Sequence, residues 1–357
     1  MPTQRPKQQH PVPPRTVTPQ VASAKTSVVS TPRSLTPKQT KKLALDPKLE
    51  WEKRQTAVRT GQHKPTIHVA VVGHVDAGKS TLVGHLLNLL HLVDAKQFRQ
   101  HQKQAAALNK TSFVYAWALD SSSEERERGV TIDTATMTFR LPDVDVVILD
   151  NPGHKDFVAN MIRGSCQADV GILVVSAIIN EFESGFRGGG QTKEHAVLLR
   201  SMGIRRMVVA INKMDQVDWA ETNYAHLVTV LTDFLVHHIG FRSDMITFVP
   251  VSGLKGINLL TPQDDALPVE TMTTDLPDVL KTWYQGHSLT HHLNAATPRT
   301  MQSIGPTRFF VDDSVPGGTG NATVTCLGRL LRGNLQINQQ VLLLPQKIYG
   351  VIKSIHI

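Results

Sequence analysis

The stretch that decides the fold is a nine-residue run, Gly73-His74-Val75-Asp76-Ala77-Gly78-Lys79-Ser80-Thr81. An apolar run at 67–72 precedes it and an apolar-periodic run follows it, which predicts a strand, a glycine loop and a helix. The spacing fits G-x-x-x-x-G-K-[ST], the phosphate-binding loop, whose backbone N–H groups surround phosphate oxygens at a helix N-terminus. We expect the whole run to contact a nucleotide, with Lys79 at its β- and γ-phosphates and Ser80 on Mg²⁺. A chance match in an ordinary turn is disfavoured because the strand and the helix are both in place.

The rest of the chain up to about residue 293 alternates apolar runs with longer amphipathic stretches. Strands are predicted at 67–72, 135–141, 144–149, 170–176, 206–211 and 246–251. Helices are predicted at 80–92, 155–165, 192–202 and 219–239. This alternation predicts an α/β fold, with helices on both faces of a mostly parallel sheet. Phosphate ligands of such sheets bind at the carboxyl ends of the strands.

Two further motifs are suited to the phosphate end of a nucleotide. Asp150-Asn151-Pro152-Gly153-His154 follows a predicted strand, so Asp150 is expected to hold Mg²⁺ through water and Gly153 to meet the γ-phosphate. His154 would lie beside the attacking water, although a histidine in a loop is more often inert. Thr131 lies in a charged stretch at 123–133, which is expected to be an exposed, mobile loop, and Thr131 is expected to close on Mg²⁺ and the γ-phosphate.

Another pair of motifs predicts the base. Asn212-Lys213-Met214-Asp215 follows a predicted strand, and the Asp215 carboxylate can accept hydrogen bonds from guanine N1–H and its exocyclic amine. Lys213 can lie over the base, and Asn212 can tie the loop together. Ser252-Gly253-Leu254 follows the last predicted strand and can offer a backbone N–H to guanine O6. The predicted ligands are therefore GTP and GDP with Mg²⁺.

Charge and composition separate the N-terminal part from the rest. Residues 1–64 contain 13 of the 38 Lys and Arg residues and 3 of the 30 Asp and Glu residues, so their +10 accounts for the net charge of +8. We expect a disordered basic tail at 1–62, which either adds salt-dependent affinity for RNA or serves as a solvated linker. Two unpaired cysteines, no long apolar run and no signal peptide predict a cytoplasmic protein without a membrane partner. No sequence-specific nucleic-acid binding is expected of the near-neutral remainder.

The ordered set of motifs resembles the GTPases of translation, because the loop reads G-H-V-D-A-G-K-S-T and the next motif reads D-x-P-G-H. The stretches at 164–168, 181–186 and 189–195 resemble the elongation factor 1-alpha branch, which includes eukaryotic release-factor GTPases. Within that branch the chain looks most like the Hbs-type ribosome-rescue GTPase, which partners Pelota. The stretches that carry this are YAWALD at 115–120, EERERGVTID at 124–133, NKMDQVDW at 212–219 and SGLKGINL at 252–259.

This resemblance implies a P-loop GTPase domain at 63–300 whose GTP hydrolysis is switched on by the ribosome. It further implies that His154 positions the attacking water, that Val75 and Val130 gate it, and that Asp76 belongs to the activated state. As a monomer, the protein would deliver a tRNA-shaped, Pelota-like factor to a stalled ribosome. A release-factor GTPase acting with a class-I release factor, aminoacyl-tRNA delivery and a non-hydrolysing adaptor for RNA decay stay open as alternatives.

The chain departs from the family pattern in two places. Asn151 stands where the family usually has Ala in D-A-P-G-H. The stretch 305–357 resembles the start of the β-barrel that follows the GTPase domain, with turn signals at 317–320 and 332–334. The family carries the rest of that barrel and a second one, so the sequence is expected to be a fragment or a truncated gene product.

Overall fold

The computed structural model describes eight parts of the chain: residues 64–107, 114–119, 125, 131–187, 190–260, 275–298, 306–316 and 323–355. The predicted disordered tail at 1–62 lies outside them. The first six parts form an α/β structure, and the last two parts form β-strands.

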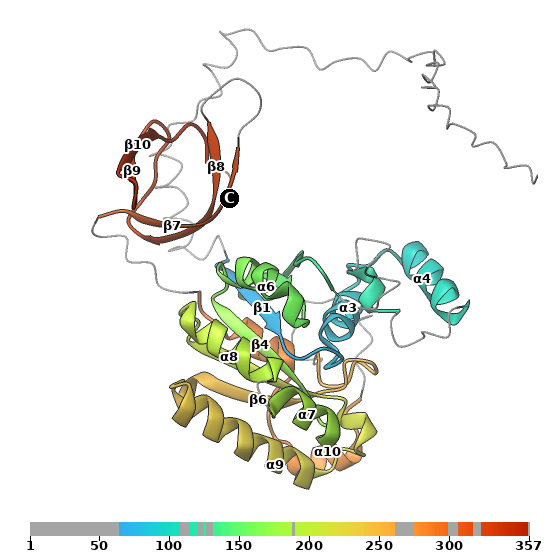
Figure 1. The fold of residues 1–357 in the computed structure, drawn as a ribbon. Coiled ribbons are helices and arrows are strands. Elements are labelled where there is room, and N and C mark those ends of the chain that lie inside the picture. The colour runs from blue at the N-terminus through green and yellow to red at the C-terminus, as the bar shows by residue number, and fades with distance from the viewer. Residues whose placement is uncertain are drawn as a thin grey trace, which may run out of the picture. The chain divides into compact units, whose positions relative to one another are not determined.

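A six-stranded sheet organises the α/β part, in the order β2-β3-β1-β4-β5-β6. Figure 1 shows β1, β4 and β6 of this sheet among the helices. Its strands are β1 (Thr66–Val72), β2 (Ala135–Arg140), β3 (Asp145–Asp150), β4 (Val170–Ser176), β5 (Arg206–Asn212) and β6 (Ile246–Pro250). Only the edge strand β2 runs antiparallel, to β3, and the other neighbours in this sheet are parallel. The mostly parallel sheet predicted from the alternating pattern is therefore confirmed.

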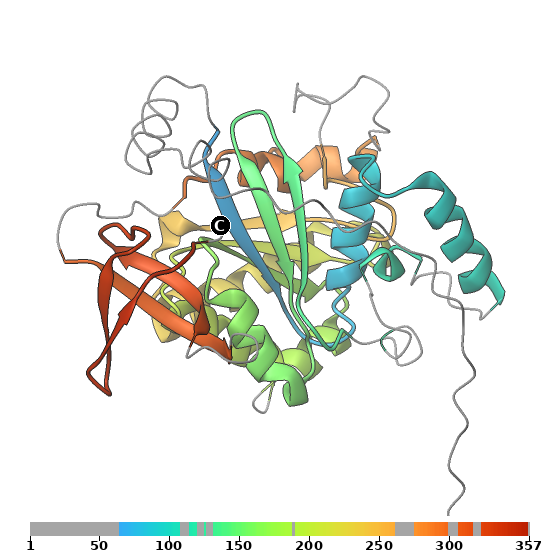
Figure 2. The same ribbon diagram turned by 90° about the horizontal axis from the view of Figure 1, so that it is seen from above.

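Helices cover both faces of this sheet, as the sequence predicts. The longer ones are α3 (Lys79–Leu89), α4 (Ala95–Ala107), α6 (Val158–Ser165), α7 (Ile179–Phe186), α8 (Gln191–Ser201), α9 (Glu221–Thr232), α10 (Asp278–Trp283) and α11 (Leu289–Asn294). Short helical turns complete them: η2 (Ala116–Ala118), η3 (Lys155–Phe157), η4 (Met214–Gln216), η5 (Asp233–His238) and η6 (Ser243–Met245). Figure 2 shows the strands between green helices on one side and the orange helical segment on the other.

Side-chain alternation along β1 separates the two hydrophobic cores. Val69 and Val71 point to the core that includes Leu82 of α3 and Leu289 of α11. Ala70 and Val72, which alternate with them along the strand, point to the opposite core. The other members of that core include Met161 of α6, Leu199 of α8 and Leu227 of α9. A strand buried on both faces reads as a continuous apolar run, which is why β1 and β4 lack a polar alternation.

The parallel register brings the carboxyl ends of neighbouring strands to one edge. Val71 pairs with Asp150, so the loop after β1 and the loop after β3 start side by side. Ser176 pairs with Asn212 in the same way at the ends of β4 and β5. β1 lies between β3 and β4, so the strand order runs in opposite directions on its two sides. Sheets of this kind bind ligands at the point where the strand order reverses.

Two differences from the predicted elements have a local cause. The helix predicted at 219–239 begins at Glu221 and changes to π-type at 233, where the Ile239 N–H donates to the Phe234 carbonyl. The helix predicted from residue 155 starts as the 3₁₀ turn η3 before α6 continues it. The sequence analysis also did not predict α4, α7 or the six-residue helices α10 and α11. α4 has few apolar residues, and α7 is only eight residues long.

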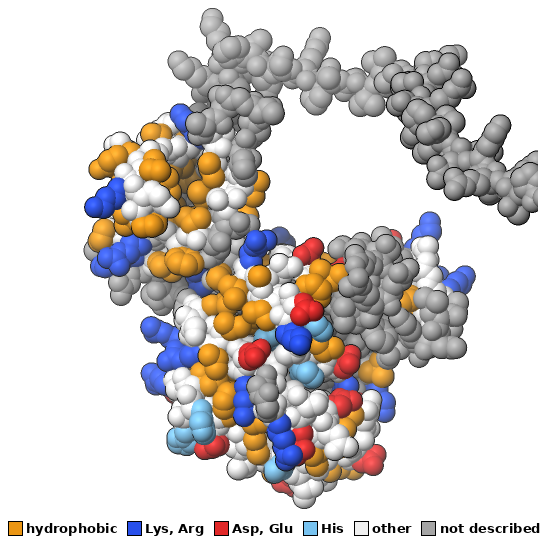
Figure 3. Space-filling view, in the orientation of Figure 1, with side chains coloured by type: hydrophobic (Ala, Val, Ile, Leu, Met, Phe, Trp, Pro, Cys, Tyr) orange, Lys and Arg blue, Asp and Glu red, His pale blue; other side chains and the backbone are white. Residues whose placement is uncertain are grey.

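The β-strands expected after residue 305 are present as two two-stranded antiparallel sheets. They are β7 (Arg308–Pro316) with β8 (Val324–Arg332), and β9 (Gln340–Leu343) with β10 (Ile348–Val351). Figure 3 shows many hydrophobic side chains on the surface of these strands. The exposed hydrophobic residues of these strands include Phe310, Val324, Leu342 and Tyr349. Among the described residues these strands do not close into a barrel.

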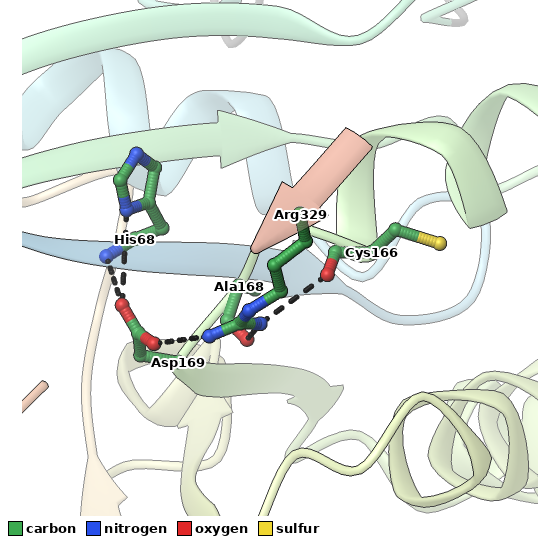
Figure 4. Close-up of polar contacts among 5 residues, drawn as sticks. All are labelled: His68, Cys166, Ala168, Asp169 and Arg329. Carbon is green, nitrogen blue, oxygen red and sulfur yellow. Dashed lines mark hydrogen bonds and ion pairs between the residues drawn. The ribbon is translucent and has the colours of Figure 1, made fainter. Parts of the chain in front are cut away.

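Arg329 of β8 connects these strands to the α/β part (Figure 4). Its guanidinium donates to the carbonyl oxygens of Cys166 and Ala168 and, at 2.6 Å, to Asp169 Oδ1. The other carboxylate oxygen of Asp169 accepts from the backbone N–H of His68 in β1, at 3.0 Å. Burial would raise the pKa of Asp169, but the hydrogen bonds from His68 and the charge of Arg329 hold it below its usual value.

No helix within the described parts of the chain is long and apolar enough to cross a membrane.

Ile172 provides a test of this core, because it lies fully buried in the central strand β4. We expect Ile172→Ala to lower the free energy of unfolding by about 2–5 kcal/mol, since it leaves a cavity that the packed sheet cannot refill. Urea denaturation followed by circular dichroism would measure the change. The control Val197→Ala removes a largely exposed side chain from α8 and should change stability by less than about 1 kcal/mol. Equal effects of the two substitutions would contradict this core assignment.

Candidate functional site

The loop between β1 and α3 has the backbone that its glycines permit. Gly78 caps α3 in the left-handed region, at φ 88°, and Asp76 is also left-handed, at φ 61°. A Cβ at Gly73 would clash with the Val174 carbonyl of the neighbouring strand β4. The loop therefore packs directly on β4 while the N-terminus of α3 stays open, which is the geometry that cradles phosphate groups.

Lys79 and Asp150 bring two opposite charges into the interior behind this loop. The Lys79 side chain is 7 % exposed, and its Nζ donates to the His74 carbonyl at 2.9 Å. Burial lowers the pKa of Lys79 to about 8, although the charge of Asp150 raises it in part. Burial also raises the pKa of Asp150 to about 6. Both groups are desolvated, so each gains from a ligand of the opposite charge.

The oxygen atoms around Asp150 fit a magnesium ion. Asp150 is 0 % exposed, and neither carboxylate oxygen has a hydrogen-bond partner among the residues that the structure describes. The hydroxyls of Ser80 and Thr131 lie 3.0 Å apart, although 51 residues separate them in the chain. Mg²⁺ prefers carboxylate and hydroxyl oxygens together with waters and phosphate oxygens, so a site with one carboxylate is sufficient. No group of three or more His, Cys, Asp or Glu side chains suited to a metal occurs within the described ranges.

His154 directly follows Gly153 and is the N-cap residue of η3. Its Nδ1 accepts from the Asp156 backbone N–H at 3.2 Å, and its side chain is 37 % exposed. The neighbouring Gly153 sits against the loop, since an added Cβ there would clash with Lys79 Nζ and would lie 3.2 Å from the Val75 backbone nitrogen. Val75 is half-buried, whereas its predicted partner Val130 lies outside the described residues.

Two residues of α8 support the loop, and the sequence analysis did not assign them a role. With the Gln191 amide in the orientation that satisfies its neighbours, its nitrogen lies 2.6 Å from His74 Nδ1 and 2.9 Å from the Gly153 carbonyl, and its oxygen accepts from the Lys155 N–H at 3.0 Å. His195 Nδ1 accepts from the Gly73 N–H at 3.2 Å. Burial lowers the pKa of His195 to about 4, so its ring is neutral near pH 7 with the proton on Nε2. The signal in the sequence was the spacing of Gln191 and His195, which lie four residues apart and therefore on the same face of α8.

The Asn212 side chain connects the two ends of the site. Its Nδ2 donates to the Ala77 carbonyl at 2.8 Å, and its Oδ1 accepts from the Gly253 N–H at 2.8 Å. A Cβ at Gly78 would lie 2.5 Å from Asn212 Nδ2. Asn212 therefore ties the phosphate loop to the loop after β6, a link between two loops that the sequence analysis did not specify.

Lys213 and Asp215 are held by ion pairs beside this link. Lys213 has a left-handed backbone, at φ 63°, and its Nζ lies 2.7 Å from Glu181 Oε2 of α7. The Asp215 side chain is 7 % exposed, and its Oδ2 lies 3.7 Å from Lys255 Nζ. Ser252 is buried and pairs with Ile257 across its turn. The Gly253 N–H is already bound to Asn212, so Leu254 becomes the candidate donor to a base oxygen.

Comparisons with known proteins agree with this geometry. The family model described as the elongation factor Tu GTP binding domain matches residues 64–295. Elongation factor 1-alpha of Ignicoccus hospitalis is 41% identical over 298 residues, which covers 82% of this chain and 63% of that protein. Protein HBS1 of Drosophila melanogaster is 40% identical over 293 residues, or 82% of this chain and 41% of its own length. The chain therefore spans less than two thirds of the length of either relative.

A solved structure supports the fold. The Ski7 GTPase-like domain of S. cerevisiae, bound to GDP and inorganic phosphate, matches with a TM-score of 0.59 and 20% sequence identity. The match covers 84% of this chain and 66% of that chain. Strand order, loop geometry and the matched family model agree, and the chain belongs to the family that carries the elongation factor Tu GTP-binding domain.

Proposed function

We propose that this protein binds GTP and GDP with Mg²⁺ and hydrolyses GTP as a translation factor on the ribosome. The observation that carries the proposal is the convergence of four loops at the carboxyl edge of one sheet. These loops hold Lys79, Asp150, Asn212 and Gly253, and hydrogen bonds of Asn212 link the first loop to the last. A guanine nucleotide needs a phosphate-binding part and a base-binding part of the site at a fixed distance from each other. In this proposal Asn212 sets that distance.

The phosphate end would act mainly through positioned charge. Lys79 would bind the β- and γ-phosphates, and the loop residues Gly73 to Thr81 would offer backbone N–H groups. Ser80, Thr131 and Asp150 would hold the metal, Asp150 through water. When bound, Mg²⁺ neutralises charge on the β- and γ-phosphate oxygens. The Gly153 N–H would donate to the γ-phosphate, so the presence of that phosphate would affect the position of α6.

Hydrolysis would use His154 to orient the attacking water. Its ring is half-exposed on a short turn, so it can reorient when a ribosome contacts the site. Val75 and Val130 would gate access to the γ-phosphate, and Asp76 would belong to the activated arrangement. Because Gln191 holds both Gly153 and Lys155, α8 would set the starting position of this turn.

Within this family we propose an Hbs-type role, delivery of a Pelota-like factor to stalled ribosomes in the cytoplasm. The identity to Drosophila HBS1 and the motifs that resemble this branch support it. The comparable identity to elongation factor 1-alpha keeps aminoacyl-tRNA delivery as the second candidate. A release-factor GTPase and a non-hydrolysing adaptor are the remaining outcomes of the test.

Ribosome-stimulated GTP turnover tests the enzymatic part of the proposal. We expect GTP hydrolysis to accelerate when ribosomes and a Pelota-like factor are added together. GTP binding without any stimulation would instead indicate the adaptor role. Capture from lysate on a GTP analogue then separates the partners: a Pelota-like protein supports rescue, whereas a class-I release factor or aminoacyl-tRNA overturns it.

Asp215→Asn tests the base end. The amide should lose the hydrogen bonds to guanine N1–H and the exocyclic amine, weakening GTP binding by about 100-fold or more. It should tolerate xanthosine nucleotides, because xanthine has an oxygen where guanine has its amine. Titration with fluorescent nucleotides measures both. Asp218→Asn, an exposed change in the same loop, should leave GTP binding unchanged. Unaltered GTP affinity in the Asp215 variant would remove this residue from base recognition.

His154→Ala tests the water-positioning role. Nucleotide binding should stay within about twofold, while ribosome-stimulated turnover should fall by about 10²–10⁴-fold, the usual contribution of a group that assists proton transfer. Single-turnover hydrolysis on ribosomes measures this. His238→Ala, which removes another exposed histidine, is the matched control. Normal stimulated turnover of the His154 variant would exclude it from the mechanism.

The two buried charges predict a window of pH for nucleotide binding in Mg²⁺. Affinity should fall as pH drops through about 6, because Asp150 then takes up a proton and loses its attraction for the metal. It should also fall as pH rises through about 8, because Lys79 then loses the proton that attracts phosphate. Calorimetric titration at several pH values measures both limits. Asp150→Asn should flatten the acidic limb and Asp156→Asn should retain it; an identical limb in both would refute the assignment.

A further inference from the structure

The Asn151 side chain, which the family pattern does not explain, is fixed in one orientation. It is fully buried directly after Asp150. Its Nδ2 donates to the carbonyl oxygens of Val71, at 3.2 Å, and Leu149, at 3.0 Å. Both N–H groups are therefore used on the strand side, and Oδ1 must face the opposite way.

Oδ1 of Asn151 accepts from the Thr134 hydroxyl at 3.2 Å. The same hydroxyl lies 3.2 Å from the Asn160 carbonyl of α6. Gly164 of α6 leaves the space for this contact, because a Cβ there would clash with Asn151 Oδ1 and would lie 2.6 Å from the Thr134 hydroxyl. The Asn151–Thr134 contact is thus enclosed between the end of β3 and α6.

Thr134 ends a short segment, residues 131–134, that is held at every position. Asn160 Nδ2 donates to the Ile132 carbonyl and to Asp133 Oδ1, each at 3.0 Å. Glu125 Oε1, which is buried, accepts from the N–H groups of Ile132 and Asp133 at 3.0 and 3.3 Å. Asn151 adds the tie at the C-terminal end of the segment.

The N-terminal end of the same segment reaches the metal site. Thr131 lies beside Ser80, with 3.0 Å between their hydroxyl oxygens. Only two residues lie between Thr131 and Thr134, so a restraint on Thr134 limits how far Thr131 can move from Ser80. An alanine at position 151 has no oxygen to provide this restraint.

We propose that Asn151 is a positioning residue: its amide latches residues 131–134 to β3 and α6 and so favours the arrangement with Thr131 beside Ser80. The effect on nucleotides rests on the proposed function. Thr131 would contact the metal and the γ-phosphate, and only the triphosphate has a γ-phosphate. The latch therefore raises the preference of this chain for GTP over GDP, compared with a site that has alanine in this place.

Asn151→Ala is the first test. The affinity for a non-hydrolysable GTP analogue should fall about three- to tenfold, the effect of one hydrogen bond, while the affinity for GDP should not change. A defect confined to folding would weaken both nucleotides alike. In the nucleotide-free protein, amide exchange at Ile132 and Asp133 should become faster. Thr134 keeps the Asn160 carbonyl as an acceptor, so the variant leaves no buried hydroxyl unpaired.

Thr134 provides an independent variant and a double-mutant cycle. Thr134→Val should reproduce the loss of GTP preference, and Thr134→Ser, which keeps the hydroxyl, should retain the preference. The double variant Asn151→Ala with Thr134→Val should be no worse than the more severe single variant, because the contact is lost once. Thr136→Val, an exposed change two residues further along β2, is the matched control.

The results separate failure of the latch from failure of the proposed function. Unchanged exchange at Ile132 and Asp133 in Asn151→Ala, or strictly additive effects in the cycle, would overturn the latch. If the unaltered protein binds neither nucleotide, the proposed function fails, and the exchange rates still decide whether Asn151 restrains the segment. Faster exchange with an unchanged GTP-to-GDP affinity ratio would refute the claim that the latch sets nucleotide preference.

Discussion

The burial of Lys79 and Asp150 behind one loop is the interaction on which the site depends. Each charge is taken out of water, and the pKa values of about 8 and about 6 show that both charged forms are disfavoured there. Their mutual attraction offsets only part of that desolvation. The remainder favours any ligand that brings a cation to the carboxylate and an anion to the ammonium group together. The site is thus electrostatically prepared for a metal–phosphate pair.

The scaffold keeps this unfavourable arrangement in place from two sides. β4 packs under Gly73, and α8 supplies Gln191 and neutral His195 as hydrogen-bond partners for the loop. Asn212 closes the other side by joining the loop to the turn after β6. None of these supports depends on a mobile charged side chain, which explains how a loop with left-handed residues and buried charges stays ordered.

Motif positions at strand ends were sufficient to predict the sheet and most candidate site residues. Lys79 was predictable from the spacing of the glycine loop that follows an apolar strand. Asp150 and Asn212 were predictable because each directly follows a predicted apolar strand, and parallel strands bring such ends together. Gln191 and His195 were not predictable, because their roles depend on how α8 packs against a loop about 120 positions earlier in the sequence. The sequence also did not show that the Gly253 N–H donates to Asn212. A sequence shows that a donor exists, but tertiary contacts decide which acceptor takes it.

Arg329 has a practical consequence for anyone who excises the α/β part. Its guanidinium holds the Cys166 and Ala168 carbonyls, which lie in the turn between α6 and β4, together with the Asp169 carboxylate. A fragment that stops at residue 298 keeps the sheet, but these acceptors lose their hydrogen bonds to Arg329 and would be solvated by water instead. The turn at the base of α6 would lose a clamp from outside its own chain segment. Measurements on such a fragment would therefore describe a looser α6 than the longer protein has, and the choice of end point becomes an experimental variable.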